Sequence, residues 1–195
     1  MIKKNYLENL DNSKKPFIIY KSNKGFDLYT DFSKKIILTN NNIEKFINKS
    51  TKFKSKKKET DLFIGFFGYE ILNNLIGIRI KKQKSLNFPK GIFYKPESKF
   101  KLPIKLNYKA SKISKFNKSF KININKASYK VIFDKFKNKI KSGETYQIKI
   151  CTKYSNKTQI NALDFFCRLV KSNMAPEAFM IKDKDYSIIS CSPEN

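Results

Sequence analysis

Two short stretches hold the side chains whose types and spacing suggest chemistry. Residues 143–152, Gly-Glu-Thr-Tyr-Gln-Ile-Lys-Ile-Cys-Thr, carry Gln147 and Lys149, and residues 192–194, Ser-Pro-Glu, carry Glu194. An amide hydrogen-bonds a reactant but is too weak a base to take its proton, an ammonium binds carboxylates, and a carboxyl with a raised pKa can act as an acid. Taken alone, these residues also fit an ordinary strand glutamine, a surface lysine and an exposed terminal acid.

The absence of histidine excludes several kinds of site. The chain has no His, which removes His as a general base, as a metal ligand and as the partner of a nucleophilic Ser or Cys. No G-x-G-x-x-G or G-K-[ST] pattern is present, so the glycines do not predict a phosphate loop. Cys151, Cys167 and Cys191 form no C-x-x-C pair and are odd in number, which is typical of reduced thiols in a cytosolic protein.

Lysine gives the chain a formal net charge of +26. Such a charge is typical of proteins that bind nucleic acids or anionic surfaces. Arg79 and Arg168 are the only arginines, although base and phosphate recognition favours the guanidinium group. The lysines are also spread along the whole chain, which favours a dispersed, solvated surface. A basic nucleic-acid-binding protein is the alternative, and nucleic-acid binding with a steep salt dependence would support it.

The second half of the chain shows clear secondary-structure signals. The apolar spacing predicts a helix from an N-cap at Ser128 to a stop at Gly143. A strand at 146–154 should follow, on which Gln147 and Lys149, two residues apart, share one face. A second amphipathic helix, ending near Asn173, and a hairpin come next; they are centred on residues 163–170 and 179–190.

The first half of the chain favours an antiparallel meander. Short apolar runs at 16–20, 26–29 and 35–39 alternate with polar turns, and a short helix is predicted at 43–47. The apolar run 61–72 predicts a buried strand at which two glycines, Gly65 and Gly68, allow another backbone to approach. A further strand is predicted at 91–94, the Lys/Ser-rich residues 49–58 should form an exposed loop, and no structure is assigned to 107–126.

Helices combined with antiparallel strands indicate the α+β class. No apolar run approaches the 18 residues of a membrane span, and no apolar segment follows the N-terminal lysines as in a signal peptide. We therefore expect a cytoplasmic protein without a membrane partner.

Four motifs in this order resemble the chorismate-utilising enzymes. They are Gly143-Glu144-Thr145-Tyr146-Gln147 after a helix, Asn173-Met174-Ala175-Pro176-Glu177-Ala178-Phe179, Ser192-Pro193-Glu194, and, upstream, Phe63-Ile64-Gly65-Phe66-Phe67-Gly68-Tyr69-Glu70. The family comprises anthranilate synthase component I, aminodeoxychorismate (para-aminobenzoate) synthase component I, and isochorismate and salicylate synthases. The resemblance implies part of a two-sheet sandwich with helices packed on it.

The resemblance also implies a division of the chain. Residues 1–126 would form a β-rich N-terminal region with Lys-rich loops, and 127–195 the start of the chorismate-binding catalytic domain. The family's catalytic half continues beyond its Ser-Pro-Glu, so we expect this chain to be a truncated part of a larger enzyme.

The resemblance assigns roles to residues of the two stretches 143–152 and 192–194. Glu194 matches the general acid that protonates the departing C4 hydroxyl of chorismate, and Ser192 beside it would contact substrate. Gln147 stands where the water-using relatives have a Lys base, so it indicates ammonia as the nucleophile. Lys149 departs from the usual uncharged residue; it is either a ligand of a substrate carboxylate, a partial substitute for the missing Lys, or a surface lysine.

Cofactor and partner follow from the same resemblance. Mg²⁺ is expected, with ligands in the half of the enzyme that this chain lacks, so no metal ligand is assigned here. A glutamine amidotransferase subunit would supply ammonia.

Within the family, three features favour aminodeoxychorismate synthase, which serves folate synthesis, over anthranilate synthase of tryptophan synthesis. The segment before the helix at Ser128 is short, and Met174-Ala175-Pro176 is closer to the P-A-P variant of the family motif. Feedback-inhibited anthranilate synthases carry an acid in an L-L-E-S strand, and Lys21 stands in its place here. The sequence therefore predicts no tryptophan feedback through that motif.

Overall fold

Two compact units make up the chain in the computed structural model. The sheet unit contains Met1–Ala110 and Ala162–Asn195, and the small unit contains Ser111–Asn161. The structure describes residues 6–22, 24–50, 58–77, 88–106, 108, 119–157, 159–173 and 175–192.

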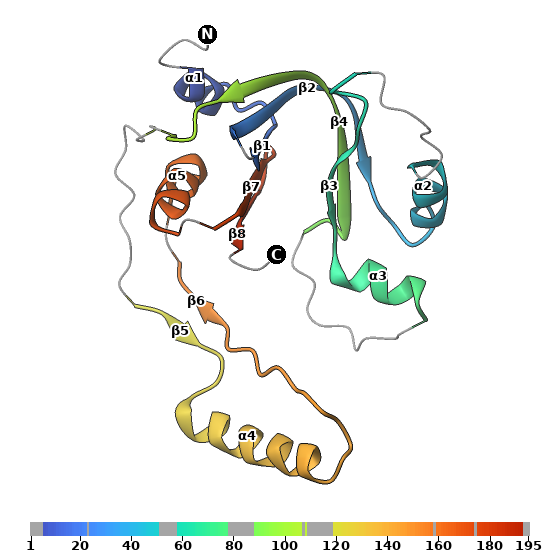
Figure 1. Ribbon diagram of the computed structural model, residues 1–195, viewed down its shortest axis with the longest axis vertical. Coiled ribbons are helices and arrows are strands. Elements are labelled where there is room, and N and C mark those ends of the chain that lie inside the picture. Colours follow the sequence, from blue (N-terminus) through green and yellow to red (C-terminus); the bar gives the residue numbers. More distant parts are fainter. Residues whose placement is uncertain are drawn as a thin grey trace. The chain divides into compact units, whose positions relative to one another are not determined.

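The sheet unit is built on a six-stranded sheet in which each pair of neighbours is antiparallel. Its strand order is β3-β4-β2-β1-β7-β8, and the two longest strands, β2 and β4, are visibly bent in Figure 1. Strand β7, near the end of the chain, therefore pairs with the first strand, β1, and β8 pairs with β7. The strands are β1 (Phe17–Ser22), β2 (Gly25–Ile37), β3 (Ile64–Phe67), β4 (Gly91–Leu102), β7 (Glu177–Lys182) and β8 (Ser187–Ser192).

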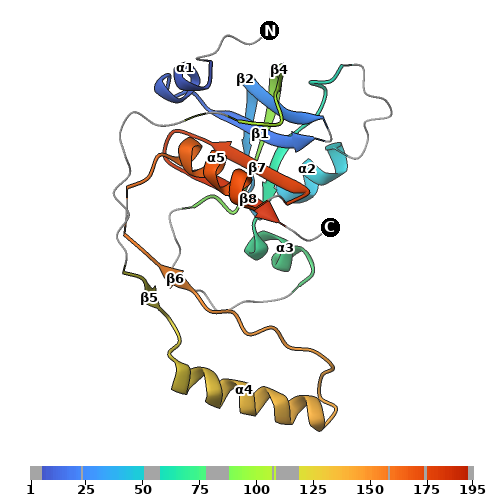
Figure 2. The same cartoon turned by 60° about the vertical axis from the view of Figure 1, so that its left-hand side comes forward.

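One face of the sheet is covered by α1 (Tyr6–Asn12) and α5 (Ala162–Ser172), as Figure 2 shows for α5 beside β1 and β7. Side chains alternate along β1, so Phe17 and Ile19 face these helices while Ile18 packs on the other side. Burying one such side chain contributes about 1.5–3 kcal/mol. The buried members of this cluster are Phe17, Ile19, Phe26, Leu28, Leu102, Leu163, Phe166, Cys167, Ala178 and Met180.

Strand β2 is one long strand where the sequence predicts two separate ones, at 26–29 and 35–39. It runs through the polar residues between 26–29 and 35–39, because β4 pairs with it along its length, with a register shift between Phe32 and Lys34. Asp31, next to this bulge, has a φ of 52°, a left-handed conformation that Asp tolerates better than most residues. Long-range pairing thus overrides the local turn signals.

Two helices pack near the other end of β4, α2 (Ile43–Ser50) and α3 (Tyr69–Leu75). The predicted strand 61–72 is therefore partly wrong: the observed strand β3 ends at Phe67, and residues 69–72 belong to the helix α3. The close backbone approach is confirmed: an added Cβ on Gly65 would lie 1.8 Å from the carbonyl oxygen of Ile92.

The small unit contains α4 (Lys126–Lys141) and a two-stranded sheet of β5 (Lys121–Ile122) and β6 (Tyr154–Ser155). The cap of α4 is Asn125 and not the predicted Ser128: the Asn125 side chain accepts a hydrogen bond of 2.8 Å from the Ser128 amide. The predicted strand 146–154 is also wrong for most of its length. A strand needs a hydrogen-bonding neighbour, and within the described part of this segment Tyr154 pairs with β5.

The α+β class, with antiparallel strands and helices packed on them, is confirmed. The helix that α5 forms and the β7–β8 hairpin also agree with the sequence. The compact units do not follow the division at residue 126, because α5, β7 and β8 join the first sheet; as a boundary of a catalytic domain, that division stays a prediction. Among the described residues, no helix is both long and apolar enough to cross a membrane.

Candidate functional site

Gln147 and Lys149 lie in the small unit, on the extended segment after α4. Gly143 ends this helix with a φ of 77°, which glycine adopts without strain. The hydroxyl of Thr145 then donates a hydrogen bond of 3.1 Å to the carbonyl oxygen of Gln147. The side chains of Gln147 and Lys149 are exposed, while Ile148 between them is half-buried. Exposed and half-buried positions thus alternate from Gln147 to Ile150, although the segment is not paired as a strand.

Glu144, in the same motif, is held as a charged surface residue. It accepts a hydrogen bond from the ammonium of Lys139 in the last turn of α4, and Ser142 donates a further one of 3.3 Å. The hydrogen bond and charge of Lys139 lower the pKa of the Glu144 carboxyl. A carboxyl with a lowered pKa is ionised at neutral pH and has no proton to donate, so Glu144 is not assigned as a general acid.

Ser192 is the last residue of β8 in the sheet unit and is half-buried. Pro193 and Glu194, which carries the predicted general acid, lie outside the described residues. The strand end before them is bonded to the end of α5. The side-chain amide of Asn173 donates a hydrogen bond of 3.1 Å to the carbonyl oxygen of Cys191.

The structure thus brings Gln147 and Lys149 together in the small unit and places Ser192 in the sheet unit. Neither unit by itself contains all the predicted site residues. The assignment of Glu194, Gln147, Lys149 and Ser192 to one chorismate site stays a prediction.

Lys21 and its neighbour Tyr20 bond directly to the second motif of the sequence, residues 173–179. The ammonium of Lys21 donates a hydrogen bond to the carbonyl oxygen of Ala175, and the hydroxyl of Tyr20 donates one of 2.6 Å to Glu177. The latter bond raises the pKa of Tyr20, so the hydroxyl keeps its proton. The Ala175 carbonyl oxygen therefore already accepts a hydrogen bond from a cation of the chain, the Lys21 ammonium.

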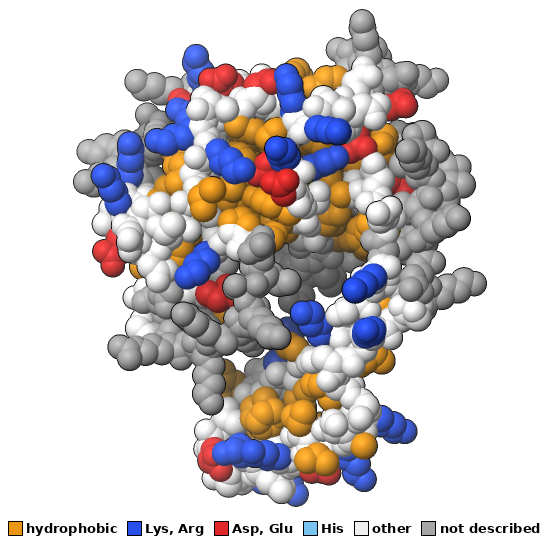
Figure 3. Space-filling model, turned by 180° about the vertical axis from the view of Figure 1, so that it is seen from behind, with side chains coloured by type: hydrophobic (Ala, Val, Ile, Leu, Met, Phe, Trp, Pro, Cys, Tyr) orange, Lys and Arg blue, Asp and Glu red, His pale blue; other side chains and the backbone are white. Residues whose placement is uncertain are grey.

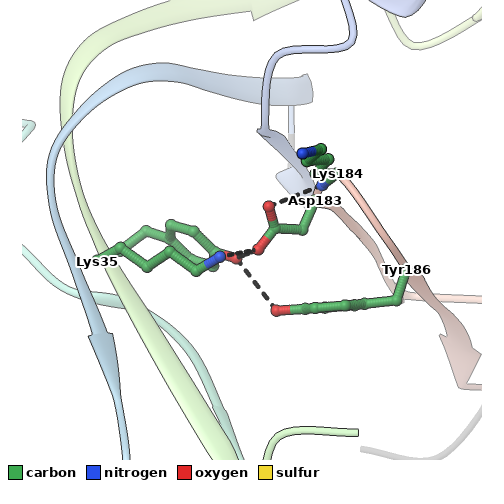
Figure 4. Close-up of polar contacts among 5 residues, drawn as sticks. Lys35, Asp183, Lys184 and Tyr186 are labelled. Carbon is green, nitrogen blue, oxygen red and sulfur yellow. Dashed lines mark hydrogen bonds and ion pairs between the residues drawn. The ribbon is translucent and has the colours of Figure 1, made fainter. Parts of the chain in front are cut away.

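A polar cluster around the buried residues Tyr94 and Asp183 lies in the sheet unit and is not predicted by the sequence. The Asp183 carboxylate, in the β7–β8 turn, accepts hydrogen bonds from the Tyr94 hydroxyl, the Lys35 ammonium and, at 2.7 Å, the Lys184 amide (Figure 4). The hydroxyl of Tyr186 lies 3.2 Å from that of Tyr94. No local signal could identify the cluster, because its members come from two strands, β2 and β4, and from the β7–β8 turn, which are far apart in the chain.

This cluster is suited to holding strands together and not to proton transfer. Burial raises the pKa of the Tyr94 hydroxyl, so it stays protonated as a donor. Burial would also raise the pKa of Asp183, but the hydrogen bonds from Lys35, Tyr94 and Lys184 and the Lys35 charge hold it below its ordinary value. Asp183 therefore stays charged at neutral pH, and the Tyr94 hydroxyl stays its neutral donor.

Lysine and arginine side chains are scattered over the face seen in Figure 3, with hydrophobic and uncharged side chains between them. This distribution fits the dispersed positive charge expected from the sequence. Among the described residues, no group of three or more Cys, Asp or Glu side chains could hold a metal ion. None of them is therefore assigned as a Mg²⁺ ligand.

Comparison with known proteins adds a family match. A family model described as chorismate binding enzyme matches residues 4–195. Anthranilate synthase component 1 of Buchnera aphidicola subsp. Pemphigus spyrothecae is 32% identical over 77 residues. These residues make up 40% of this chain and 15% of that protein, so the match spans a small part of the relative's length.

Proposed function

Because the chain belongs to the chorismate binding enzyme family, we propose that it acts as part of component I of an aminodeoxychorismate synthase. In this function, chorismate is aminated at C4 for the synthesis of para-aminobenzoate and folate. Ammonia would come from a glutamine amidotransferase subunit. Mg²⁺ stays part of the proposal through the family resemblance.

The main support for amination by ammonia is the presence of Gln147 in the motif after α4. Its side chain is exposed on the segment after α4, at the motif position where the water-using relatives have a Lys base. An amide does not deprotonate water, but ammonia is a nucleophile that needs no such base. Gln147 would orient the ammonia by hydrogen bonds, and Lys149, exposed two residues further on, would bind a carboxylate of chorismate.

Glu194 would supply the proton for the leaving group. The bond between C4 and the hydroxyl oxygen breaks as the carboxyl proton passes to that oxygen, so the group leaves as water instead of hydroxide. A new bond from nitrogen to carbon replaces it, and the amino product loses the excess proton of the ammonia to solvent or to the Glu194 carboxylate. The balance is one ammonia consumed and one water released.

Lys21 is the feature that favours C4 amination within the family. In feedback-inhibited anthranilate synthases an acid at the matching position meets the ammonium of tryptophan. Here a lysine stands at that position and its ammonium is bonded to the Ala175 carbonyl oxygen. Such a site would repel the ammonium of an amino acid, which suits an enzyme outside tryptophan synthesis.

Anthranilate synthase component I is the second candidate, because the similarity to the Buchnera protein favours it. In that reaction chorismate is aminated at C2 and pyruvate is eliminated. Both candidates use the same substrate and ammonia, so product identity separates them.

The test uses the protein at the full length that the cell produces, incubated with chorismate, Mg²⁺ and ammonium. We expect a product that becomes para-aminobenzoate only after aminodeoxychorismate lyase is added. Fluorescent anthranilate, formed without the lyase, would contradict the proposal and support the second candidate. Gln147→Lys provides a matched variant: we expect loss of ammonia-dependent turnover, because the cation replaces the amide that orients ammonia.

A further inference from the structure

The hydroxyl of Thr145 bonds to the backbone of Gln147, two residues further along the chain. It donates a hydrogen bond of 3.1 Å to the Gln147 carbonyl oxygen, and Thr145 is half-buried while Gln147 is exposed. Such a local bond from side chain to backbone restrains the backbone dihedral angles of residues 145–147. Since these angles set the direction of the Cα–Cβ bond and the rotamers allowed, the Thr145 hydroxyl also restrains where the Gln147 side chain can point.

The segment between α4 and β6 is otherwise held at its two ends. At its start, the backbone amide of Glu144 donates a hydrogen bond of 3.0 Å to the carbonyl oxygen of Lys139 in the last turn of α4. At its far end, the Lys153 amide donates to the Asn123 side-chain oxygen at 2.6 Å, and the Asn123 amide donates to the Lys153 carbonyl oxygen at 3.1 Å. Among the described residues, no strand pairs with the segment between these ends. The Thr145 bond is therefore a restraint inside a segment that has no ladder of strand hydrogen bonds.

We propose that Thr145 is a positioning residue: its bond to the Gln147 backbone holds the Gln147 amide in the orientation in which it binds ammonia. This inference rests on the proposed function, in which Gln147 orients ammonia by hydrogen bonds. A hydrogen bond weakens steeply as its angle becomes smaller, so an amide that turns away from ammonia loses much of its effect. Thr145 touches neither ammonia nor chorismate in this role.

Thr145→Val tests the inference, because valine keeps the branched shape of threonine and removes the hydroxyl. The protein is used at the full length that the cell produces, at fixed pH, with saturating chorismate and varied ammonium. We expect kcat/KM for ammonia to fall about three- to tenfold, the usual effect of losing one hydrogen bond. KM for chorismate should change by less than about twofold, since the part of the segment that carries Lys149 is still held at Lys153. Thr145→Ser keeps the donor and should retain the wild-type constants.

Thr152→Val is the matched control, because it makes the same chemical change on the same segment. Thr152 is half-buried like Thr145, and in the described part of the chain its hydroxyl has no hydrogen-bond partner. We expect Thr152→Val to keep both constants within about twofold of the wild-type values. Equal losses in the two valine variants, or in Thr145→Val and Thr145→Ser, would contradict a role of the Thr145 hydroxyl.

A double-mutant cycle with Gln147→Ala shows whether Thr145 acts through Gln147. Without the Gln147 amide there is nothing left to position, so adding Thr145→Val to Gln147→Ala should not lower kcat/KM for ammonia further. A further fall as large as the one in the wild-type background would overturn the inference, because Thr145 would then act on another group.

Two outcomes separate the inference from the proposed function. If Thr145→Val does not fold, as judged by circular dichroism, Thr145→Ala removes the same hydroxyl with a smaller side chain and takes its place. An active wild type whose folded variant keeps its kcat/KM for ammonia would overturn the role of Thr145 alone. A wild-type protein that does not aminate chorismate with ammonia would overturn the proposed function, and the role of Thr145 with it.

Discussion

Tyr94 and Asp183, 89 residues apart in the chain, meet through a hydrogen bond from the tyrosine hydroxyl to the carboxylate. Tyr94 is 1% exposed and Asp183 is 6% exposed, so this bond is shielded from water. It joins β4 to the β7–β8 turn, and the Lys35 ammonium of β2 bonds to the same carboxylate. The carboxylate therefore connects the early and late strands of the sheet.

Replacing this carboxylate should destabilise the sheet unit. Asp183→Asn keeps the shape but removes the charge that Lys35 and Tyr94 bond to, and we expect a loss of about 1–3 kcal/mol in the free energy of unfolding. Urea denaturation followed by circular dichroism measures it. Asp185→Asn, an exposed acid in the same turn, is the control and should change stability by less than about 0.5 kcal/mol. Equal losses in the two variants would contradict the role of the cluster.

The same carboxylate should make stability fall in acid. The pKa of Asp183 is lower in the folded protein than in the unfolded chain, where an aspartate has a pKa of about 3.9. Its contribution is therefore complete above about pH 4 and is lost as the pH falls toward the folded-state pKa. We expect the difference in unfolding free energy between wild type and Asp183→Asn to be constant from about pH 7 to pH 5. It should shrink at about pH 3, and a difference that grows there would contradict this assignment.

Local signals in the sequence were sufficient for the elements that depend on few distant contacts. Gly143 ends α4, and the apolar spacing of α5 and the β7–β8 turn are read directly from neighbouring residues. Asn125 and Ser128 are both good caps, and only geometry shows that the Asn125 side chain reaches the amide three residues on.

Elements that depend on pairing could not be predicted in this way. Residues 146–152 have the alternation of a strand but no paired strand in the described part of the small unit, whereas β2 continues through polar residues because it pairs with β4. The Tyr94–Asp183 bond depends on the same long-range pairing. The motif residues Gln147 and Ser192 were recognised by resemblance, since neither burial nor hydrogen bonding distinguishes them locally.

Gly65 should tolerate no side chain. A Cβ there would lie 1.8 Å from the Ile92 carbonyl oxygen and 2.7 Å from the Phe93 Cα, both backbone atoms of the paired strand. We expect Gly65→Ala to lower the free energy of unfolding by about 3 kcal/mol or more, since β3 must move away from β4. Thermal denaturation should show a clearly lower Tm. Gly77→Asn is the control, because that position has a φ of 77°, which Asn tolerates, and open space around it.

Lys21 should prevent tryptophan from binding at the end of β1. Its ammonium is bonded to the Ala175 carbonyl oxygen, and its charge would repel the ammonium of an amino acid. We expect isothermal titration of the full-length enzyme with L-tryptophan to show no saturable heat, and chorismate turnover to be unchanged by it. Micromolar binding that competes with chorismate and disappears in Lys21→Ala would contradict this prediction.

Lys149 should contribute to substrate binding if the proposed function is correct. Its side chain is exposed two residues after the exposed Gln147, and a bond from its ammonium to a chorismate carboxylate would be charge-assisted. We expect Lys149→Ala to raise KM for chorismate about tenfold with kcat changed by less than about twofold, the pattern of a lost binding interaction. Lys153→Ala is the matched control, because Lys153 is exposed on the same segment. Its backbone amide donates a hydrogen bond of 2.6 Å to the side-chain oxygen of Asn123, and this bond does not depend on the lysine side chain. Equal KM values for the two variants would identify Lys149 as a surface lysine. A lowered kcat in Lys149→Ala, restored by Lys149→Arg, would instead indicate that the cation acts in the reaction itself.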